Sequence, residues 1–157
     1  VHGRTAWAEG IGEILTPIPW SSDCGRDVLP PWYLVVKPDC EVSTAAVFSD
    51  PRLTRDTPKR RIAAAVEGID SSFRNDCQEL VRCLHEEVDQ ALRWLESSSP
   101  ARLTGTGSCI FTMLPTRSAG EAILAQLPER WQGFVAKGLL ESPLLGELAE
   151  AQGSTKF

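Results

Sequence analysis

Residues 101–114 read ARLTGTGSCIFTML, two apolar runs of strand length joined by a loop of small residues. Within the loop, Gly105 and Gly107 alternate with Thr106 and Ser108. Glycines allow positive φ and let backbone N–H groups approach a ligand closely, so such a loop suits a phosphate group. Taken alone, the pattern is more typical of an ordinary connection between strands. The stretch therefore predicts two strands whose connection is the first candidate site.

An uninterrupted apolar run lies upstream, at residues 32–37, and Pro38 ends it. A run of this length without polar alternation predicts a central strand. Residues 43–48 predict a short helix with a hydroxyl cap, closed by Asp50 and Pro51. Pro58 then predicts the start of another short helix over residues 59–66.

The strongest helical pattern covers residues 76–97. Asn75 is its expected cap, Gln78 stands at the capping-box position, and a serine run followed by Pro100 ends it. We expect one continuous helix whose apolar stripe packs in the core. The stripe consists of Cys77, Leu80, Val81, Leu84, Val88, Ala91, Leu92 and Leu95.

A helix over residues 118–127 and a strand over 133–137 complete the order β, α, β, β, α, β. This order predicts an α+β fold, a ferredoxin-like split βαβ sandwich with helices on one face of an antiparallel sheet. Near the start, residues 5–15 predict a β-hairpin interrupted at Gly10 and Gly12.

The expected organisation has four parts. Residues 1–18 form the hairpin, 19–31 a proline-rich linker, 32–144 the main domain and 145–157 a tail that frays after a terminal helix.

The composition of the chain disfavours several classes of partner and site. The chain has 157 residues, 42% hydrophobic, and a formal net charge of -5, which disfavours nucleic acid and anionic membranes as partners. Five cysteines without CxxC spacing indicate neither a disulfide framework nor zinc, so we expect a reducing compartment. No apolar run is long enough to span a bilayer and no leader is visible, so a cytoplasmic protein is expected. His2 and His85 are expected on the surface, and no metal ligand is predicted.

Six segments occur in one order: residues 8–17, 32–35, 47–51 with 57–59, 75–76, 102–109 and 133–138. Together they closely resemble the C-terminal part of the 4-diphosphocytidyl-2-C-methyl-D-erythritol kinases. That family belongs to the superfamily of galactose, homoserine, mevalonate and phosphomevalonate kinases. The resemblance runs from Val1 to about Leu144. It implies that the main phosphate loop and the catalytic aspartate belong to an N-terminal half preceding Val1, and that this chain is half an enzyme. It also implies that the hairpin of residues 1–18 belongs structurally to that missing half and that residues 32–144 are the C-terminal substrate-binding domain.

The resemblance implies a reaction: transfer of the γ-phosphoryl group of ATP to the 2-hydroxyl of a cytidine-diphosphate-linked methylerythritol, in non-mevalonate isoprenoid synthesis. ATP and magnesium are then co-substrate and ion of the full-length enzyme, held tightly by no residue of this chain. The missing N-terminal kinase domain is the expected partner, and this chain alone is expected to be inactive.

Site residues are implied in the same way. Phe48 matches an aromatic residue that stacks on cytosine, and the main chain of Ile11 matches the position that reads the cytosine edge. Thr44 matches a hydroxyl near the methylerythritol, and residues 105–108 match a glycine-rich motif facing the phosphate cleft. The alternatives to these ligand-binding roles are structural: a core position for Phe48 and helix capping for Thr44. No catalytic residue is expected in this chain.

Three features allow an alternative interpretation. A free-standing ferredoxin-like binding or regulatory module remains the alternative function, because fold does not determine function. Lys59, Arg60 and Arg61 are expected to be a solvated face, with a phosphate contact as the alternative. The hairpin carries Trp7, Ile11, Ile14 and Leu15 on an unpaired edge, a feature that favours self-association.

Overall fold

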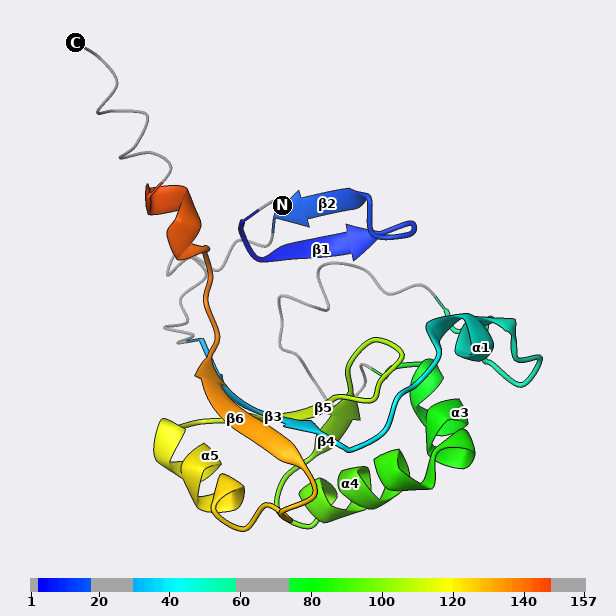
Figure 1. Ribbon diagram of the computed structural model, residues 1–157. Helices are drawn as coiled ribbons and strands as arrows, with labels where there is room; N and C mark the ends of the chain where they lie inside the picture. Colours follow the sequence, from blue (N-terminus) through cyan, green and yellow to red (C-terminus); the bar gives the residue numbers. More distant parts are fainter. Residues whose placement is uncertain (1–2, 18–29, 59–73, 148–157) are drawn as a thin grey trace. The chain divides into compact units, whose positions relative to one another are not determined.

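The computed structural model describes residues 3–17, 30–58 and 74–147 (Figure 1). The chain divides into two compact units, each described by itself. One comprises residues 1–30, 60–69 and 139–157, and the other comprises 31–59 and 70–138. The helix predicted over 59–66, the basic cluster at 59–61, His2, most of the proline-rich connection and the end of the tail lie outside the described residues.

The larger unit is built on a four-stranded antiparallel sheet. Its strands are β3 (Trp32–Lys37), β4 (Ala101–Leu103), β5 (Ile110–Leu114) and β6 (Gln132–Lys137), in the order β4-β5-β3-β6. Trp32 pairs with Leu114 on one side and with Lys137 on the other. The predicted central strand is thereby confirmed, and the strand order is that of the ferredoxin-like α+β fold.

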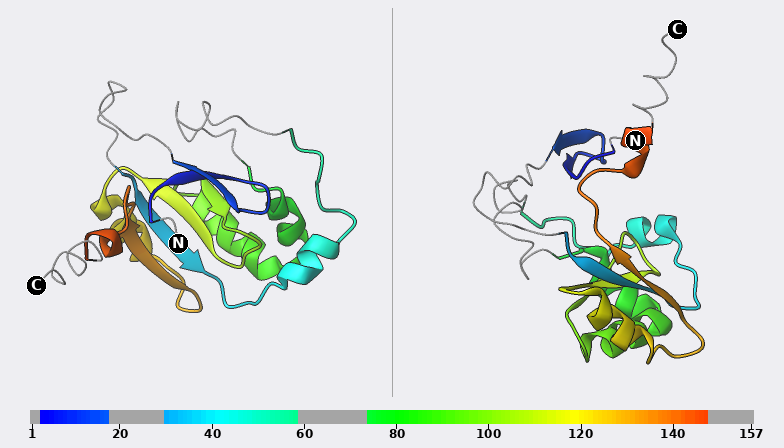
Figure 2. Two further views of the ribbon diagram at one scale, coloured as in Figure 1. Left: turned by 90° about the horizontal axis from the view of Figure 1, so that it is seen from above. Right: turned by 90° about the vertical axis from the view of Figure 1, so that its left-hand side faces the viewer.

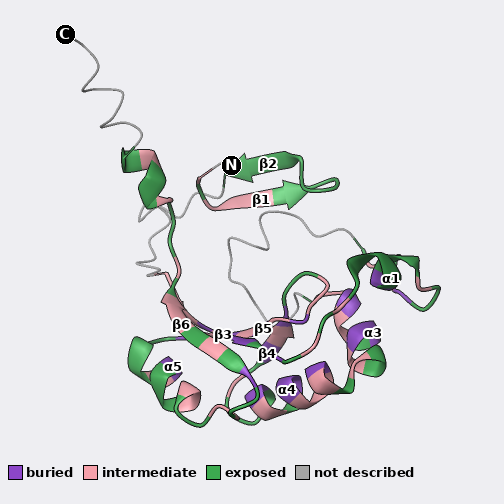
Figure 3. Ribbon diagram, viewed as in Figure 1, coloured by how far each residue is buried: buried purple, intermediate pink, exposed green. Residues whose placement is uncertain are grey.

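Helices lie on one side of this sheet, as Figures 1 and 2 show for α3 (Cys77–Leu84), α4 (Glu86–Glu96) and α5 (Arg117–Leu124). The short helix α1 (Thr44–Ser49) contacts α3. Alternate residues of β3, β4 and β5 are buried, and they belong to the core drawn in purple in Figure 3. The largest fully buried side chains include Leu34, Val36, Val81, Val88, Leu92, Leu95 and Ile110.

The prediction of one continuous helix over residues 76–97 is wrong. The segment forms two helices, α3 and α4, that meet at His85 in an extended conformation with φ −131° and ψ 94°. Arg82 spans the break, donating to Asp89 at 2.7 Å and to Glu96 at 2.9 Å. Seven of the eight stripe residues stay in the core, whereas Leu84, beside the break, is 41% exposed, so the expected core position of Leu84 is wrong.

The start of α3 also differs from expectation. The N-cap is Asp76, whose side chain makes no capping bond, and Asn75 precedes it with its Oδ1 accepting from the Cys77 N–H at 2.9 Å. Gln78 does not complete a capping box. Its Oε1 instead accepts from the Leu103 N–H at 2.8 Å, because the end of β4 lies within reach.

The smaller unit contains the predicted hairpin. Strands β1 (Ala6–Glu9) and β2 (Ile14–Pro17) are antiparallel, and the turn between them uses positive φ at Gly10 (+69°) and Gly12 (+102°). Residues 139–147 belong to the same unit, since the Thr5 N–H donates to the Leu140 carbonyl at 3.0 Å. Across the three described ranges, no helix combines the length and apolarity that crossing a membrane requires. The predicted domain boundaries stay predictions.

Candidate functional site

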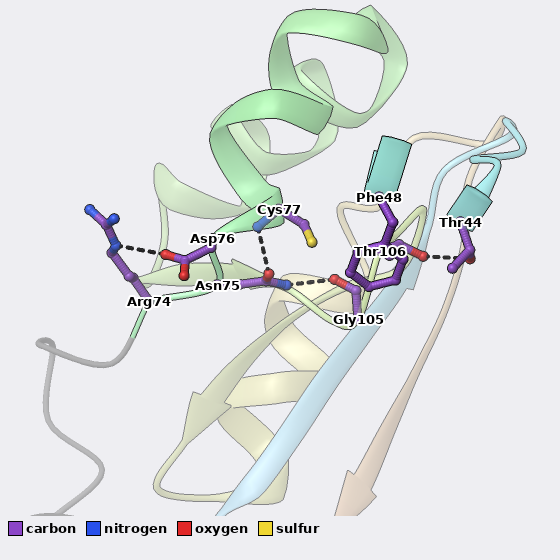
Figure 4. Close-up of a pocket in the computed structure, with 8 residues that line it drawn as sticks. All are labelled: Thr44, Phe48, Arg74, Asn75, Asp76, Cys77, Gly105 and Thr106. Carbon is purple, nitrogen blue, oxygen red and sulfur yellow. Dashed lines mark hydrogen bonds and ion pairs between the residues drawn. The ribbon is translucent and has the colours of Figure 1, made fainter. Parts of the chain in front are cut away.

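An open pocket of about 670 Å³ lies in the larger unit, where α1, the start of α3 and the β4–β5 loop meet (Figure 4). Its lining residues are Thr44, Phe48, Arg74, Asn75, Asp76, Cys77, Gly105 and Thr106. Four residues predicted for the site therefore share one hollow, although 57 positions of sequence separate Phe48 from Gly105.

The α1 wall is positioned by a cap and an anchor. The Ser43 hydroxyl accepts from the Ala46 N–H at 3.3 Å, and Val47 is buried in the core with 1% exposure. Thr44 and Phe48 are four residues apart and share the outward face. The Phe48 ring is 58% exposed, so the core alternative for Phe48 is wrong. The capping alternative for Thr44 is also wrong, since Ser43 is the cap.

The β4–β5 loop presents its outer half to the pocket. Gly105 has φ +56° and Gly107 has φ +86°, conformations that suit glycine, and the peptide bond between Gly107 and Ser108 is cis. Thr104 and Gly107 donate their N–H groups within the loop. Within the described residues, the N–H groups of Gly105 and Thr106 have no intramolecular acceptor. These two donors remain available to a ligand.

The inner half of the same loop is structural. Ser108 is 8% exposed and hydrogen-bonds the Cys40 thiol, opposing the effect of burial, which raises the pKa of that thiol. A Cβ at Gly107 would lie 3.0 Å from the Leu103 side chain. Gly107 and Ser108, both predicted to face the cleft, are not among the pocket-lining residues. The reason is that the turn presents its first two residues, Gly105 and Thr106, to the pocket and packs the next two, Gly107 and Ser108, against the core.

The start of α3 closes the pocket with polar contacts. Asn75 Nδ2 donates to the carbonyls of Leu103 at 3.0 Å and Gly105 at 2.6 Å. Asp76 accepts from the Thr57 hydroxyl at 2.8 Å and from Arg74 Nε at 3.0 Å. The Arg74 side chain is 62% exposed, so its guanidinium group combines an ion pair with access to solvent.

Across the pocket mouth, the hydroxyls of Thr44 and Thr106 lie 2.8 Å apart and hydrogen-bond each other. This contact joins α1 to the loop (Figure 4). The bond therefore links the Thr106 side chain to the helix that carries Phe48.

The groups that line the pocket suit the binding of a ligand. Burial raises the pKa of the Cys77 thiol, and the neighbouring Asp76 carboxylate raises it further, so the thiol stays protonated at neutral pH. In the described part of the chain, no three His, Cys, Asp or Glu side chains are grouped to hold a metal ion. An exposed ring, two hydroxyls, an arginine and free N–H groups suit a ligand with a planar ring and an anionic group.

Ile11 lies in the other unit, in the turn between β1 and β2, with a fully exposed side chain. Its N–H donates to the Glu13 carboxylate at 2.6 Å. The role predicted for the Ile11 main chain stays a prediction.

Three pocket residues were missed by sequence reasoning, namely Arg74, Asp76 and Cys77, and Asn75 was assigned only a cap. An Asn-Asp pair before an apolar stripe indicates a helix start. It carries no signal that a loop some 30 residues later in the chain returns to that start.

Comparisons with known proteins identify relatives of this chain. The family described as "GHMP kinases C terminal" matches residues 53–133. A 4-diphosphocytidyl-2-C-methyl-D-erythritol kinase from Hahella chejuensis is 49% identical over 96% of this chain and 48% of its own length. Its counterpart from Alkalilimnicola ehrlichii is 49% identical over 98% of this chain and 49% of its own length. The chain thus spans about half the length of these curated relatives.

A solved structure also has this fold. The crystal structure of a 4-(cytidine 5'-diphospho)-2C-methyl-D-erythritol kinase superposes with a TM-score of 0.60 at 24% identity. The match covers 87% of this chain and 51% of that protein.

Proposed function

The chain belongs to the GHMP kinase family, and from that premise we propose that it forms the substrate-binding side of a 4-diphosphocytidyl-2-C-methyl-D-erythritol kinase. In the proposed reaction, the 2-hydroxyl of the substrate attacks the γ-phosphorus of ATP. The bond to the β–γ bridging oxygen breaks, ADP leaves, and the hydroxyl proton passes to a base. Such transfers depend chiefly on positioning and charge stabilisation.

One observation supports this proposal most directly. An exposed phenylalanine and a glycine loop with two free N–H groups line the same pocket, as a ligand with a base and phosphates requires. Phe48 offers a ring face on which cytosine stacks. Gly105 and Thr106, which we call the phosphate seat, offer N–H donors to the diphosphate. Thr44 places a hydroxyl beside that seat.

Arg74 supplies the positive charge at this pocket. Its guanidinium is partly neutralised by Asp76 but remains exposed, so a diphosphate is able to compete for it. Because burial and the Asp76 carboxylate raise the pKa of the Cys77 thiol, we assign no nucleophilic role to it. The role proposed for the pocket is therefore to bind and orient the ligand.

The remaining catalytic parts come from elsewhere in the proposed kinase. Among the described residues, no helix begins at a glycine-rich run, which is the usual binding site of ATP phosphates. No step is assigned to a metal ion held by the described residues. ATP with its magnesium ion is a co-substrate of the whole kinase, and the main chain of Ile11 contributes to the cytosine contact. This chain alone accordingly shows no ATP-dependent phosphorylation of the substrate.

Calorimetric titration with cytidine 5'-diphosphate tests the proposal. The Phe48→Ala variant is expected to bind about 5- to 150-fold more weakly than the parent, the range for losing one base–aromatic stack of ~1–3 kcal/mol. Phe134→Ala is the matched control, since Phe134 on β6 is 57% exposed, nearly the same as Phe48, and lies outside the pocket. Its affinity is expected to equal that of the parent.

Two results would overturn the proposal. One is equal affinity of Phe48→Ala and the parent. The other is the absence of measurable binding by the parent chain at millimolar ligand. ATP-dependent phosphorylation of the substrate by the purified chain would contradict the assignment of the catalytic base to other residues.

A further inference from the structure

Asn75 connects three parts of the pocket through one side chain (Figure 4). Its Nδ2 donates to the carbonyls of Leu103 and Gly105, and its Oδ1 accepts from the Cys77 N–H. Both N–H groups of the side-chain amide therefore donate hydrogen bonds to backbone carbonyls. Although Asn75 lines the pocket, its amide donors are committed to the protein rather than free for a ligand.

The bond to Gly105 determines which way the next N–H group points. The peptide unit between Gly105 and Thr106 is planar and trans, so the Gly105 carbonyl and the Thr106 N–H point in opposite directions. Since the carbonyl points to Asn75 at 2.6 Å, the Thr106 N–H points away from Asn75. A rotated peptide would exchange this donor for an oxygen that repels an anion.

Packing does not hold this orientation. Gly105 has no side chain, and no atom lies within 4 Å of where its Cβ would stand. With φ +56° it also has the conformational freedom of glycine. On the far side, the Thr44 hydroxyl holds the Thr106 side chain but not the peptide before it. Among the described contacts, Asn75 is thus the side chain that restrains the Gly105 carbonyl.

We propose that Asn75 is a positioning residue for the phosphate seat: by holding the Gly105 carbonyl, it aims the Thr106 N–H at the phosphate of the ligand. This inference rests on the proposed function. It adds a specific consequence, because loss of Asn75 should weaken binding of the phosphate groups and leave binding of the cytosine ring unchanged.

The test compares cytidine with cytidine 5'-diphosphate by calorimetry. The central variant is Asn75→Ser, which is uncharged and keeps an oxygen for the Cys77 N–H but cannot reach the two carbonyls. The matched control is Gln78→Ala, which removes the bond to the Leu103 N–H from the same turn of α3 without touching Gly105. Thermal melting of both variants measures any general loss of stability.

The parent and Gln78→Ala are expected to bind the diphosphate more tightly than cytidine by the same factor. In Asn75→Ser, the ratio of diphosphate affinity to cytidine affinity is expected to fall about tenfold or more, which is the contribution of one hydrogen bond to a charged group. The affinity for cytidine itself is expected to stay unchanged. A full diphosphate preference in Asn75→Ser, or an equal loss in Gln78→Ala, overturns the inference alone. A parent without any diphosphate preference overturns the phosphate seat as well.

A second measurement needs no variant. Titration of the parent with inorganic phosphate, followed by NMR, is expected to shift the Thr106 amide signal strongly. An unmoved Thr106 signal alongside shifts at other pocket amides would contradict the orientation assigned to it.

Discussion

Arg55 is expected to hold the helix that carries Phe48. Its guanidinium donates to the carbonyls of Phe48 at 2.6 Å, Leu53 at 3.0 Å and Asp50 at 3.2 Å. The last carbonyls of a helix lack intrahelical partners, and a cation there also stabilises the helix dipole. Because α1 has only six residues, it is too short to be stable without such contacts.

The Arg55→Gln variant removes the charge and most of these bonds. Hydrogen bonds from a charged donor contribute about 1.5–3 kcal/mol when shielded, and exposure to solvent reduces this to ~1–2 kcal/mol for the whole contact. The local opening equilibrium of α1 should then rise about 5- to 30-fold. Hydrogen exchange of the Val47 and Asp50 amides, both bonded within α1, measures this change.

Arg52→Gln is the matched control for Arg55→Gln. Arg52 is also exposed and lies three residues away, but its side chain bonds only the Asp50 carboxylate and no α1 carbonyl. Its α1 exchange rates should match those of the parent. Unchanged exchange in Arg55→Gln, or the same acceleration in both variants, would refute the reasoning.

Three further predictions concern stability. Hydrogen bonds from Arg52 lower the pKa of the Asp50 carboxyl from 3.8 to about 2. The stabilisation of the fold by this contact is therefore present above pH 3.8 and is lost as the pH falls toward 2. NMR titration of Asp50 measures its pKa, which Arg52→Gln should return toward 3.8. Gly120→Ala should lower the melting temperature, because the new Cβ would lie 2.9 Å from the Val135 side chain and such crowding costs about 1–3 kcal/mol, against a helix-propensity gain of about 1 kcal/mol. The double variant Gly120→Ala/Val135→Ala should be more stable than the sum of the two single-variant effects predicts. Leu92→Ala, at a fully buried position of α4, should cost about 2–5 kcal/mol in urea denaturation.

The sheet was predictable because its signals are local and strong. The apolar run at 32–37 and the strands flanking the glycine loop each carry their own pattern, and their order with the helices determines the arrangement. The break at His85 has no such signal, since neither proline nor glycine marks it. Periodicity alone continues through that residue.

The pocket was predictable only in part. The resemblance identified Phe48, whereas local pattern alone does not decide whether Val47 or Phe48 enters the core. Thr106 and Ser108 look alike in sequence, yet one faces the pocket and the other is buried. The contact from Asn75 to Gly105 depends on the folded loop and has no counterpart in spacing.

The position of β3 in its sheet has a consequence during synthesis. Trp32, at the start of β3, pairs with Leu114 and Lys137, so both neighbours of β3 emerge from the ribosome long after it does. In that interval the most apolar strand of the larger unit has both edges unpaired, a state that favours aggregation. Chaperone binding to the nascent chain is therefore expected to concentrate on residues 32–37 and to end once β6 has emerged.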